Sequence, residues 1–172
     1  GILLILLHFP SLAKEEKFIG RIKTSLDYLL SKQQDGNFLS SVCSRDFVYQ
    51  WCHGAPGIIA TLLKAHEIFG DGKYLKSAEE GANQVWKFGL LLKGFGLCHG
   101  ISGNAYAFLQ LYQYTKSEKY LYMAYQFCNA QADSRVLLGI ESKRGKNIVD
   151  LSLMEGISGE GCFNLDIQQP QM

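Results

Sequence analysis

Two Cys-His pairs are the residues of this sequence best suited to chemistry. Cys52-His53 and Cys98-His99 stand 46 residues apart. Thiolate and imidazole groups are the ligands that Zn²⁺ prefers, and the partial positive charge of a helix N-terminus favours the thiolate form of a nearby cysteine. Four ligands would make a closed structural site, whereas three would leave one position open for chemistry. The spacing matches no zinc finger, and small buried thiols beside hydrogen-bonded histidines are the alternative interpretation.

The two pairs belong to an internal repeat. The Lys-Tyr-Leu element of residues 73–75 recurs at 119–121, and the Gly-x-x-Gly element of residues 54–57 recurs at 100–103 with the same shift of 46. A third Gly-x-x-Gly element follows at 156–159. Two independent markers in one register indicate a repeated structural unit. We therefore expect the two Cys-His pairs to occupy equivalent positions in neighbouring units.

Each unit has the pattern of two helices. Residues 58–69 and 104–114 are apolar on nearly every side, which is typical of a helix buried all round. Residues 74–86 and 120–132 are amphipathic; in the first of these, apolar side chains recur at spacings of three and four with charged residues opposite. The strict alternation typical of strands is absent. We predict an all-α fold of stacked helical hairpins, with buried inner helices and amphipathic outer helices.

Stacked hairpins either close into an α/α toroid or extend as a solenoid of the HEAT type. A Gly-x-x-Gly element opens every inner helix, and glycine lets backbones crowd together, as the inner ring of a toroid requires. This placement favours a toroid, in which residues at the helix starts converge on one central site. Ordinary helix-start turns are the alternative explanation for these glycines.

Composition and motif spacing exclude several classes of protein. The 172 residues carry 17 Lys+Arg and 16 Asp+Glu, and a net charge of +1 argues against nucleic acid as a partner. The apolar run of residues 2–7 is too short to span a bilayer, which takes about 20 residues, and we interpret it as the end of a buried helix. The glycines at 94, 96 and 100 do not make a dinucleotide loop, whose third glycine would fall at His99. Five cysteines and no Asn-x-Ser/Thr sequon favour reduced thiols and a cytoplasmic location.

Three longer motifs contain the Cys-His pairs and the third glycine element. They are Trp-Cys-His-Gly-Ala-Pro-Gly at 51–57, Gly-Phe-Gly-Leu-Cys-His-Gly at 94–100, and Ser-Leu-Met-Glu-Gly at 152–156. Together they resemble the lanthionine synthetase C-like family in its animal form. The resemblance implies an α/α toroid with one Zn²⁺ held by two cysteines and one histidine, its fourth position open to water or a thiol. Carried over to this sequence, the ligands are Cys52, Cys98 and His99, and His53 does not bind the metal.

The resemblance also implies an activity. Two thiolates and one imidazole on Zn²⁺ make a neutral site, where an added thiol loses its proton and stays reactive. Bacterial relatives use such a site to add a peptide cysteine to a dehydroamino acid, closing a thioether ring. Animal relatives bind glutathione and are associated with adding it to electrophiles, including dehydroamino acids in damaged proteins. We therefore expect glutathione and a peptide or protein electrophile as partners.

Four further residues are implicated around the predicted zinc site. His53 is a candidate proton carrier near neutral pH, and Trp51 would line the site beside it. Lys93 matches a family position that contacts glutathione. Arg144, in the basic stretch of residues 143–146, lies where the family has another such contact, although the surrounding loop departs from the family pattern.

The resemblance covers the C-terminal part of the family's domain. We expect residues 1–172 to form an incomplete toroid that exposes apolar edges and has at most weak activity alone. Two other interpretations stay open: a non-catalytic protein that binds zinc and glutathione, and a truncated fragment that retains only zinc binding. Peripheral association with the plasma membrane also stays open. No role is assigned to the remaining cysteines, Cys43, Cys128 and Cys162.

Overall fold

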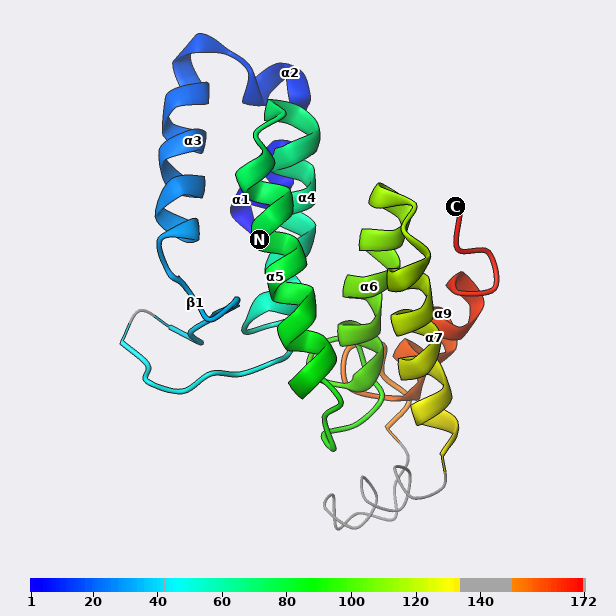
Figure 1. The fold of residues 1–172 in the computed structure, drawn as a ribbon. Coiled ribbons are helices and arrows are strands. Elements are labelled where there is room, and N and C mark those ends of the chain that lie inside the picture. The colour runs from blue at the N-terminus through cyan, green and yellow to red at the C-terminus, as the bar shows by residue number, and fades with distance from the viewer. Residues whose placement is uncertain (42, 134–149, 172) are drawn as a thin grey trace.

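The computed structural model describes residues 1–41, 43–133 and 150–171, and its regular structure is helical apart from one small hairpin (Figure 1). This confirms the all-α prediction. In chain order the elements are α1 (Ile2–Leu7), α2 (Pro10–Ala13), α3 (Glu16–Leu30), β1 (Gln33–Gln34), β2 (Asn37–Phe38), α4 (Ala55–Phe69), α5 (Gly72–Phe88), α6 (Ile101–Thr115), α7 (Glu118–Ala132) and α9 (Ile157–Asp166).

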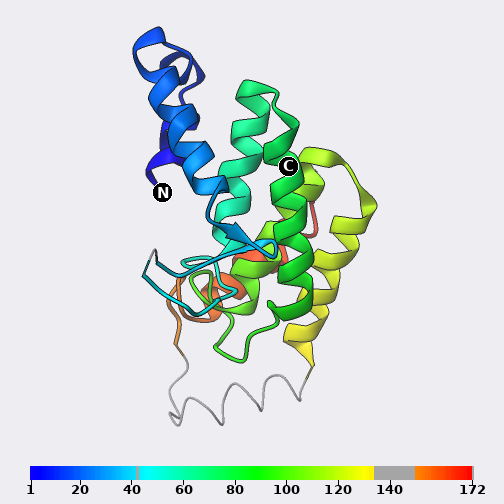
Figure 2. The same cartoon turned by 60° about the vertical axis from the view of Figure 1, so that its left-hand side comes forward.

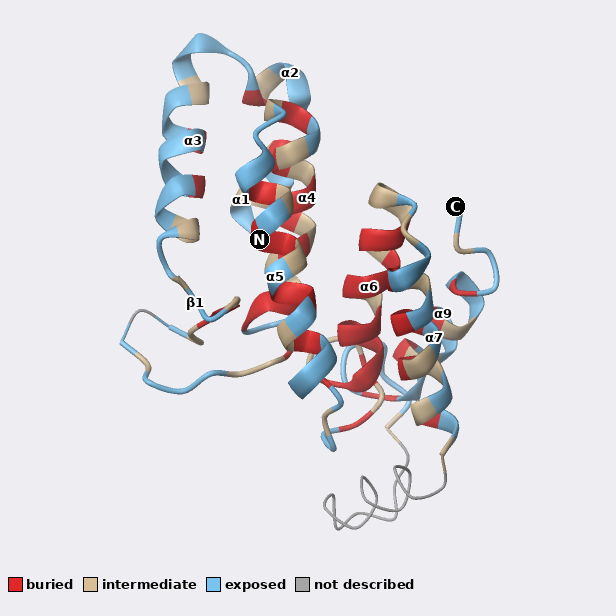
Figure 3. Ribbon diagram, viewed as in Figure 1, coloured by how far each residue is buried: buried red, intermediate tan, exposed pale blue. Residues whose placement is uncertain are grey.

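The helices stack as hairpins with an inner and an outer member. Helix α4 pairs with α5 and α6 pairs with α7, while α1 and α6 both pack on α4 and α9 packs on α6. Most residues of α4 and α6 are buried, whereas α5 and α7 bury one face and leave the other exposed (Figure 3). The predicted division into buried inner helices and half-exposed outer helices is therefore correct for both repeats.

The inner helices begin three residues earlier than the apolar pattern predicts. Gly54, Gly100 and Gly156 are the N-cap residues of α4, α6 and α9, so each Gly-x-x-Gly element spans the cap and the first turn. Pro56 lies in the first turn of α4, where its missing N–H removes no intrahelical bond. The prediction that these elements open the inner helices is confirmed.

A short β-hairpin precedes the first inner helix. Strand β1 pairs antiparallel with β2, with Gln33 opposite Phe38. Asp35 and Gly36 connect the strands with φ values of 50° and 81°, the left-handed conformation that an Asp-Gly hairpin turn adopts. Strict alternation cannot appear in strands of two residues, so the alternation test missed this hairpin, although the Asp-Gly pair marks it.

The apolar run at residues 2–7 forms α1, but most of it is not buried. Leu7 is fully buried against the core, whereas Ile2 is 80% exposed and Ile5 is 62% exposed. The interpretation of this run as a buried helix is therefore correct only for its C-terminal end, because only one side of α1 packs against α4 and α3. Across the described ranges, no helix combines the length and hydropathy needed to cross a membrane.

The second glycine of each Gly-x-x-Gly element lies against the loop that leads into its own helix. A Cβ atom added to Gly57, Gly103 or Gly159 would lie 2.0, 1.9 or 2.5 Å from the carbonyl oxygen six residues earlier. A Cβ at that distance from a backbone atom cannot be accommodated without moving the loop. The repeated glycine therefore allows each loop to fold tightly across the start of its helix.

Alanine substitution tests this close approach. We expect Gly103→Ala to lower the free energy of unfolding by about 1–3 kcal/mol, the usual cost of overpacking a tight site, as measured by urea denaturation. Gly20 in α3 and Gly161 in α9 are matched controls, because a Cβ at either position meets no atom within 4 Å. Alanine there should raise stability by about 0.5–1 kcal/mol through helix propensity. Equal effects at all three positions would contradict the proposed role of Gly103.

Candidate metal centre

Three loops meet at the N-terminal ends of the inner helices. The loops before α4, α6 and α9 lie side by side at one end of the helix stack (Figures 1 and 2). The backbone N–H of Cys52 donates to the carbonyl of Cys98 at 3.1 Å, and the N–H of Cys98 donates to the carbonyl of Met154 at 2.7 Å. These three residues hold the same position in the three Gly-x-x-Gly motifs, so one backbone contact is repeated from loop to loop.

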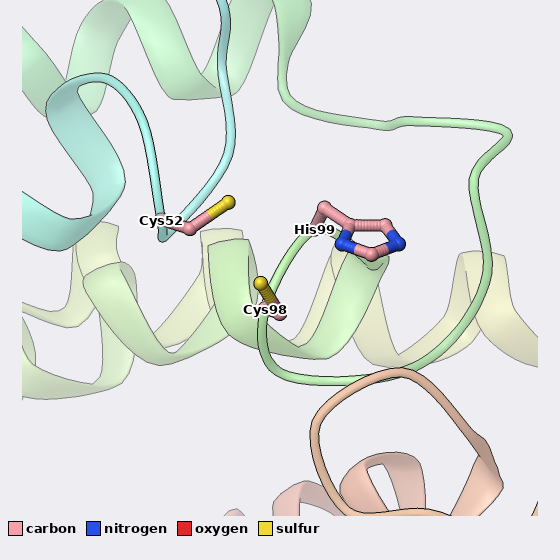
Figure 4. Close-up of side chains that lie close together, drawn as sticks. All are labelled: Cys52, Cys98 and His99. Carbon is pink, nitrogen blue, oxygen red and sulfur yellow. The ribbon is translucent and has the colours of Figure 1, made fainter. Parts of the chain in front are cut away.

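This packing brings three of the four residues of the Cys-His pairs together. The ligand atoms of Cys52, Cys98 and His99 all lie within 4.8 Å of one another. Figure 4 shows the two sulfur atoms and the imidazole ring around one common space, Cys52 coming from the loop before α4 and the other two from the loop before α6. Cys52 is exposed, and Cys98 and His99 are half-buried.

His53 does not join this group. Its Nδ1 lies 3.2 Å from the carbonyl oxygen of Ser40, and among the described residues the clustered ligands are Cys52, Cys98 and His99 alone. The geometry therefore corresponds to a three-ligand site rather than the four-ligand alternative. The side chain of Trp51 is 45% exposed next to Cys52.

The donor set fits zinc in kind and in spacing. Zn–S and Zn–N bonds of about 2.3 and 2.1 Å place tetrahedral ligands roughly 3.5–3.8 Å apart. The three ligand atoms lie within 4.8 Å of one another. Side-chain rotations that move each donor atom by about 1 Å would therefore bring them to the spacing of zinc ligands. Cys52 is exposed, so its side chain has room to make such a rotation.

The metal-free cluster does not favour a thiolate at Cys98. Burial raises the pKa of the Cys98 thiol to about 11, and the adjacent Cys52 thiol and the Glu155 carboxylate add to the effect. These influences outweigh the helix N-terminus, which sequence analysis expected to stabilise the thiolate. A thiolate at Cys98 is therefore favoured only where a nearby cation offsets these influences.

Gln50, which belongs to none of the sequence motifs, connects Lys93 to the cluster. Its amide Nε2 donates to Sγ of Cys52 at 3.3 Å, and its Oε1 accepts from Nζ of Lys93 at 2.9 Å. Lys93, predicted to contact the substrate, is thus held at the edge of the cluster. The only sequence signal for Gln50 is its place two residues before Cys52.

The other predicted residues lie away from the cluster or outside the described ranges. Arg144 and the rest of the basic stretch at 143–146 lie outside the described residues. Cys43 and Cys162 are exposed and free. Cys128 donates to Oδ1 of Asn164 at 3.2 Å, and burial raises its pKa, which suits a packing role.

Comparison with known proteins shows the family of this chain. The family model described as lanthionine synthetase C-like protein matches residues 1–172. The chain belongs to this family. One relative is "Glutathione S-transferase LANCL1" of Danio rerio, which is 38% identical to this chain over 99% of the chain and 41% of its own length. Another is "LanC-like protein GCL1" of Arabidopsis thaliana, which is 37% identical over 99% of this chain and 39% of its own length. The chain thus spans about two fifths of the length of these lanthionine synthetase C-like relatives.

Alkylation kinetics test the raised pKa of Cys98. Iodoacetamide reacts with the thiolate, so in chain treated with a chelator we expect Cys98 to react at neutral pH roughly 10-fold more slowly than an ordinary thiol. Peptide mass spectrometry reports each site separately, with the exposed Cys43 as internal reference.

The pH profile separates the pKa from simple shielding. Because deprotonation of Cys98 is centred near pH 11, its alkylation rate should still be rising between pH 9 and about 11, where an ordinary thiol of pKa about 8.5 has levelled off. A Cys98 profile that levels off below pH 9 would contradict the assignment.

Proposed function

We propose that this chain carries a zinc site that activates a thiol, that of glutathione, for addition to an electrophile such as a dehydroamino acid in a peptide or protein. The observation that carries the proposal is the convergence of Cys52, Cys98 and His99 within 4.8 Å. Family membership supports it, as does the printed name of the Danio rerio relative, a glutathione S-transferase.

The three clustered side chains would hold the metal. Two thiolates and one neutral imidazole balance the charge of Zn²⁺ and leave one coordination position open. A bound Zn²⁺ supplies one piece of chemistry: it lowers the pKa of an added thiol so that the sulfur is a nucleophile at neutral pH. Because the pKa of Cys98 is raised in the metal-free chain, a bound cation would have to displace the thiol proton, so zinc binding would release a proton at neutral pH.

Lys93 would bind the anionic part of the thiol substrate. Glutathione carries two carboxylates, and the Lys93 ammonium lies one amide side chain away from Cys52. An ammonium at that distance can hold a carboxylate while the thiol lies at the cluster. Arg144 would supply a second contact of the same kind.

His53 is suited to move the proton. A carbonyl oxygen only accepts, so Nδ1 of His53 carries the hydrogen that it shares with Ser40 and Nε2 of the neutral ring is the acceptor. In the addition, a C–S bond forms at the β-carbon of the dehydroamino acid as its C=C π bond breaks. The α-carbon takes up one proton and the thiol gives one up, and we assign that transfer to His53. Trp51, whose side chain is also exposed, would line the side on which the electrophile approaches.

Metal analysis tests the site itself. We expect the chain to bind about one Zn²⁺ per molecule, and Cys98→Ala to lose most of it, measured by elemental analysis after gel filtration. Cys162→Ala is the matched control, because Cys162 is an exposed free thiol outside the cluster. Zinc that survives in Cys98→Ala, or an equal loss in Cys162→Ala, would defeat the proposed site.

A transfer assay tests the chemistry. With Zn²⁺, glutathione and a dehydroalanine peptide, the chain should form the thioether adduct at a low rate. His53→Asn should slow that rate by roughly 10²-fold, the lower range for a general acid–base. His8→Asn is the control, since the Nδ1 of His8 bonds a backbone carbonyl, that of Leu4, in the same way. Stoichiometric zinc with no adduct would instead favour a zinc- and glutathione-binding protein without turnover.

A further inference from the structure

Gln50 is held rigidly beside the candidate metal centre. Its backbone N–H donates to the carbonyl of His53 at 3.1 Å, and the N–H of His53 donates back to the carbonyl of Gln50 at 3.0 Å. The residue is only 9% exposed. Paired backbone bonds and burial leave the side chain little freedom, so the direction of its amide is set by the fold.

The two ends of this amide contact groups of different chemistry. Nε2 donates to Sγ of Cys52 at 3.3 Å, and Oε1 accepts from Nζ of Lys93 at 2.9 Å. An ammonium has three donors and no acceptor, so the amide oxygen must face Lys93. The amide N–H group is then left to face the sulfur, and the orientation follows from chemistry alone.

We propose that Gln50 is a positioning residue that fixes the ammonium of Lys93 relative to Cys52, and so makes the site selective for thiols that carry a carboxylate. This inference rests on the proposed function. A lysine has a long flexible side chain, and holding its ammonium in place before binding removes part of the ordering cost of binding. The thiol and the carboxylate of one substrate are then matched to two groups held at a fixed separation.

The same amide acts on the sulfur. When Cys52 is a thiolate, the N–H of Gln50 makes a charge-assisted hydrogen bond to it. Such a bond from outside the coordination sphere orients a ligand and alters its donor strength. Removal of the amide should therefore change the sulfur-to-metal charge-transfer band in chain loaded with Co²⁺, a signature that a packing role alone would not produce.

The test is a double-mutant cycle with two thiols. Gln50→Met keeps the volume of the side chain but removes both polar contacts, Lys93→Met removes the ammonium, and the third variant combines them. Binding of glutathione and of 2-mercaptoethanol is followed by titrating the visible spectrum of the Co²⁺-loaded chain. Gln33→Leu is the control, because Gln33 is also a bridging amide but bonds Gly36 and Ser77 instead of the cluster.

We expect Gln50→Met to weaken glutathione binding about 10-fold, the lower range for an outer-shell partner. The double variant should lose no more affinity for glutathione than Lys93→Met alone, because the two residues act as one unit. Affinity for 2-mercaptoethanol, which has no carboxylate to contact Lys93, should fall by much less than the affinity for glutathione. Gln50→Asn has a shorter side chain that cannot reach both Cys52 and Lys93, so it should bind the two thiols as Gln50→Met does. It replaces Gln50→Met in the test if the methionine variant does not fold.

Different outcomes overturn different claims. The role of Gln50 would be overturned if Gln50→Met weakened the binding of both thiols equally, or if the losses of glutathione affinity in the cycle were additive. Either result would leave the zinc site intact. A chain that binds no Co²⁺ or Zn²⁺ at all would overturn the proposed function, and the inference would fall with it.

Discussion

One backbone interaction determines whether this chain has a site at all: the hydrogen bond that joins each helix-start loop to the next. Cys52 donates to Cys98 and Cys98 donates to Met154, so the three loops are fixed side by side in one register. The bond forms only if the loops fold closely across the starts of their helices. This requires glycine at positions such as Gly57 and Gly103, where an added Cβ would lie 2.0 and 1.9 Å from a backbone carbonyl oxygen. Side chains that are 46 residues apart in sequence then lie within reach of one metal ion.

The first loop departs from this pattern where it joins the β-hairpin. In α6 and α9 the first helical N–H donates to the carbonyl seven residues earlier, at 3.0 Å for Ile101 and 2.8 Å for Ile157. In α4 the side chain of Asn37 intervenes: its Oδ1 accepts from Ala55 at 2.7 Å and its Nδ2 donates to Val48 at 3.2 Å. The loop that carries Gln50 and Cys52 is thus tied to β2 through a buried amide, so the small hairpin contributes to the rigidity of the site.

The internal repeat made much of the helical arrangement and of the candidate site predictable from the sequence. Equivalent positions of Cys52 and Cys98 follow from the shift of 46, and helix periodicity separates the inner from the outer helices. The distinction between His99 and His53 came from family resemblance and not from spacing, because adjacent residues of a loop point in different directions that depend on local φ and ψ. Gln50 could not be foreseen, since its role depends on Lys93, a residue 43 positions away. The raised pKa of Cys98 depends on burial and neighbours, which no local sequence pattern encodes.

The third loop shows that the backbone arrangement alone is not the site. Met154 and Glu155 occupy the positions that Cys98 and His99 hold one repeat earlier, and from them Cys98 receives a hydrogen bond to a carbonyl oxygen and the effect of a negative charge. The effect of that charge differs between the two states of the site. Without a metal, the carboxylate of Glu155 opposes ionisation of Cys98 and helps to raise its pKa. With a dication balancing the two thiolates, the centre would carry no net charge, and the repulsion between Glu155 and the Cys98 thiolate would be offset. The repeat therefore supplies three equivalent places, and the side chains at two of them define where a metal can bind.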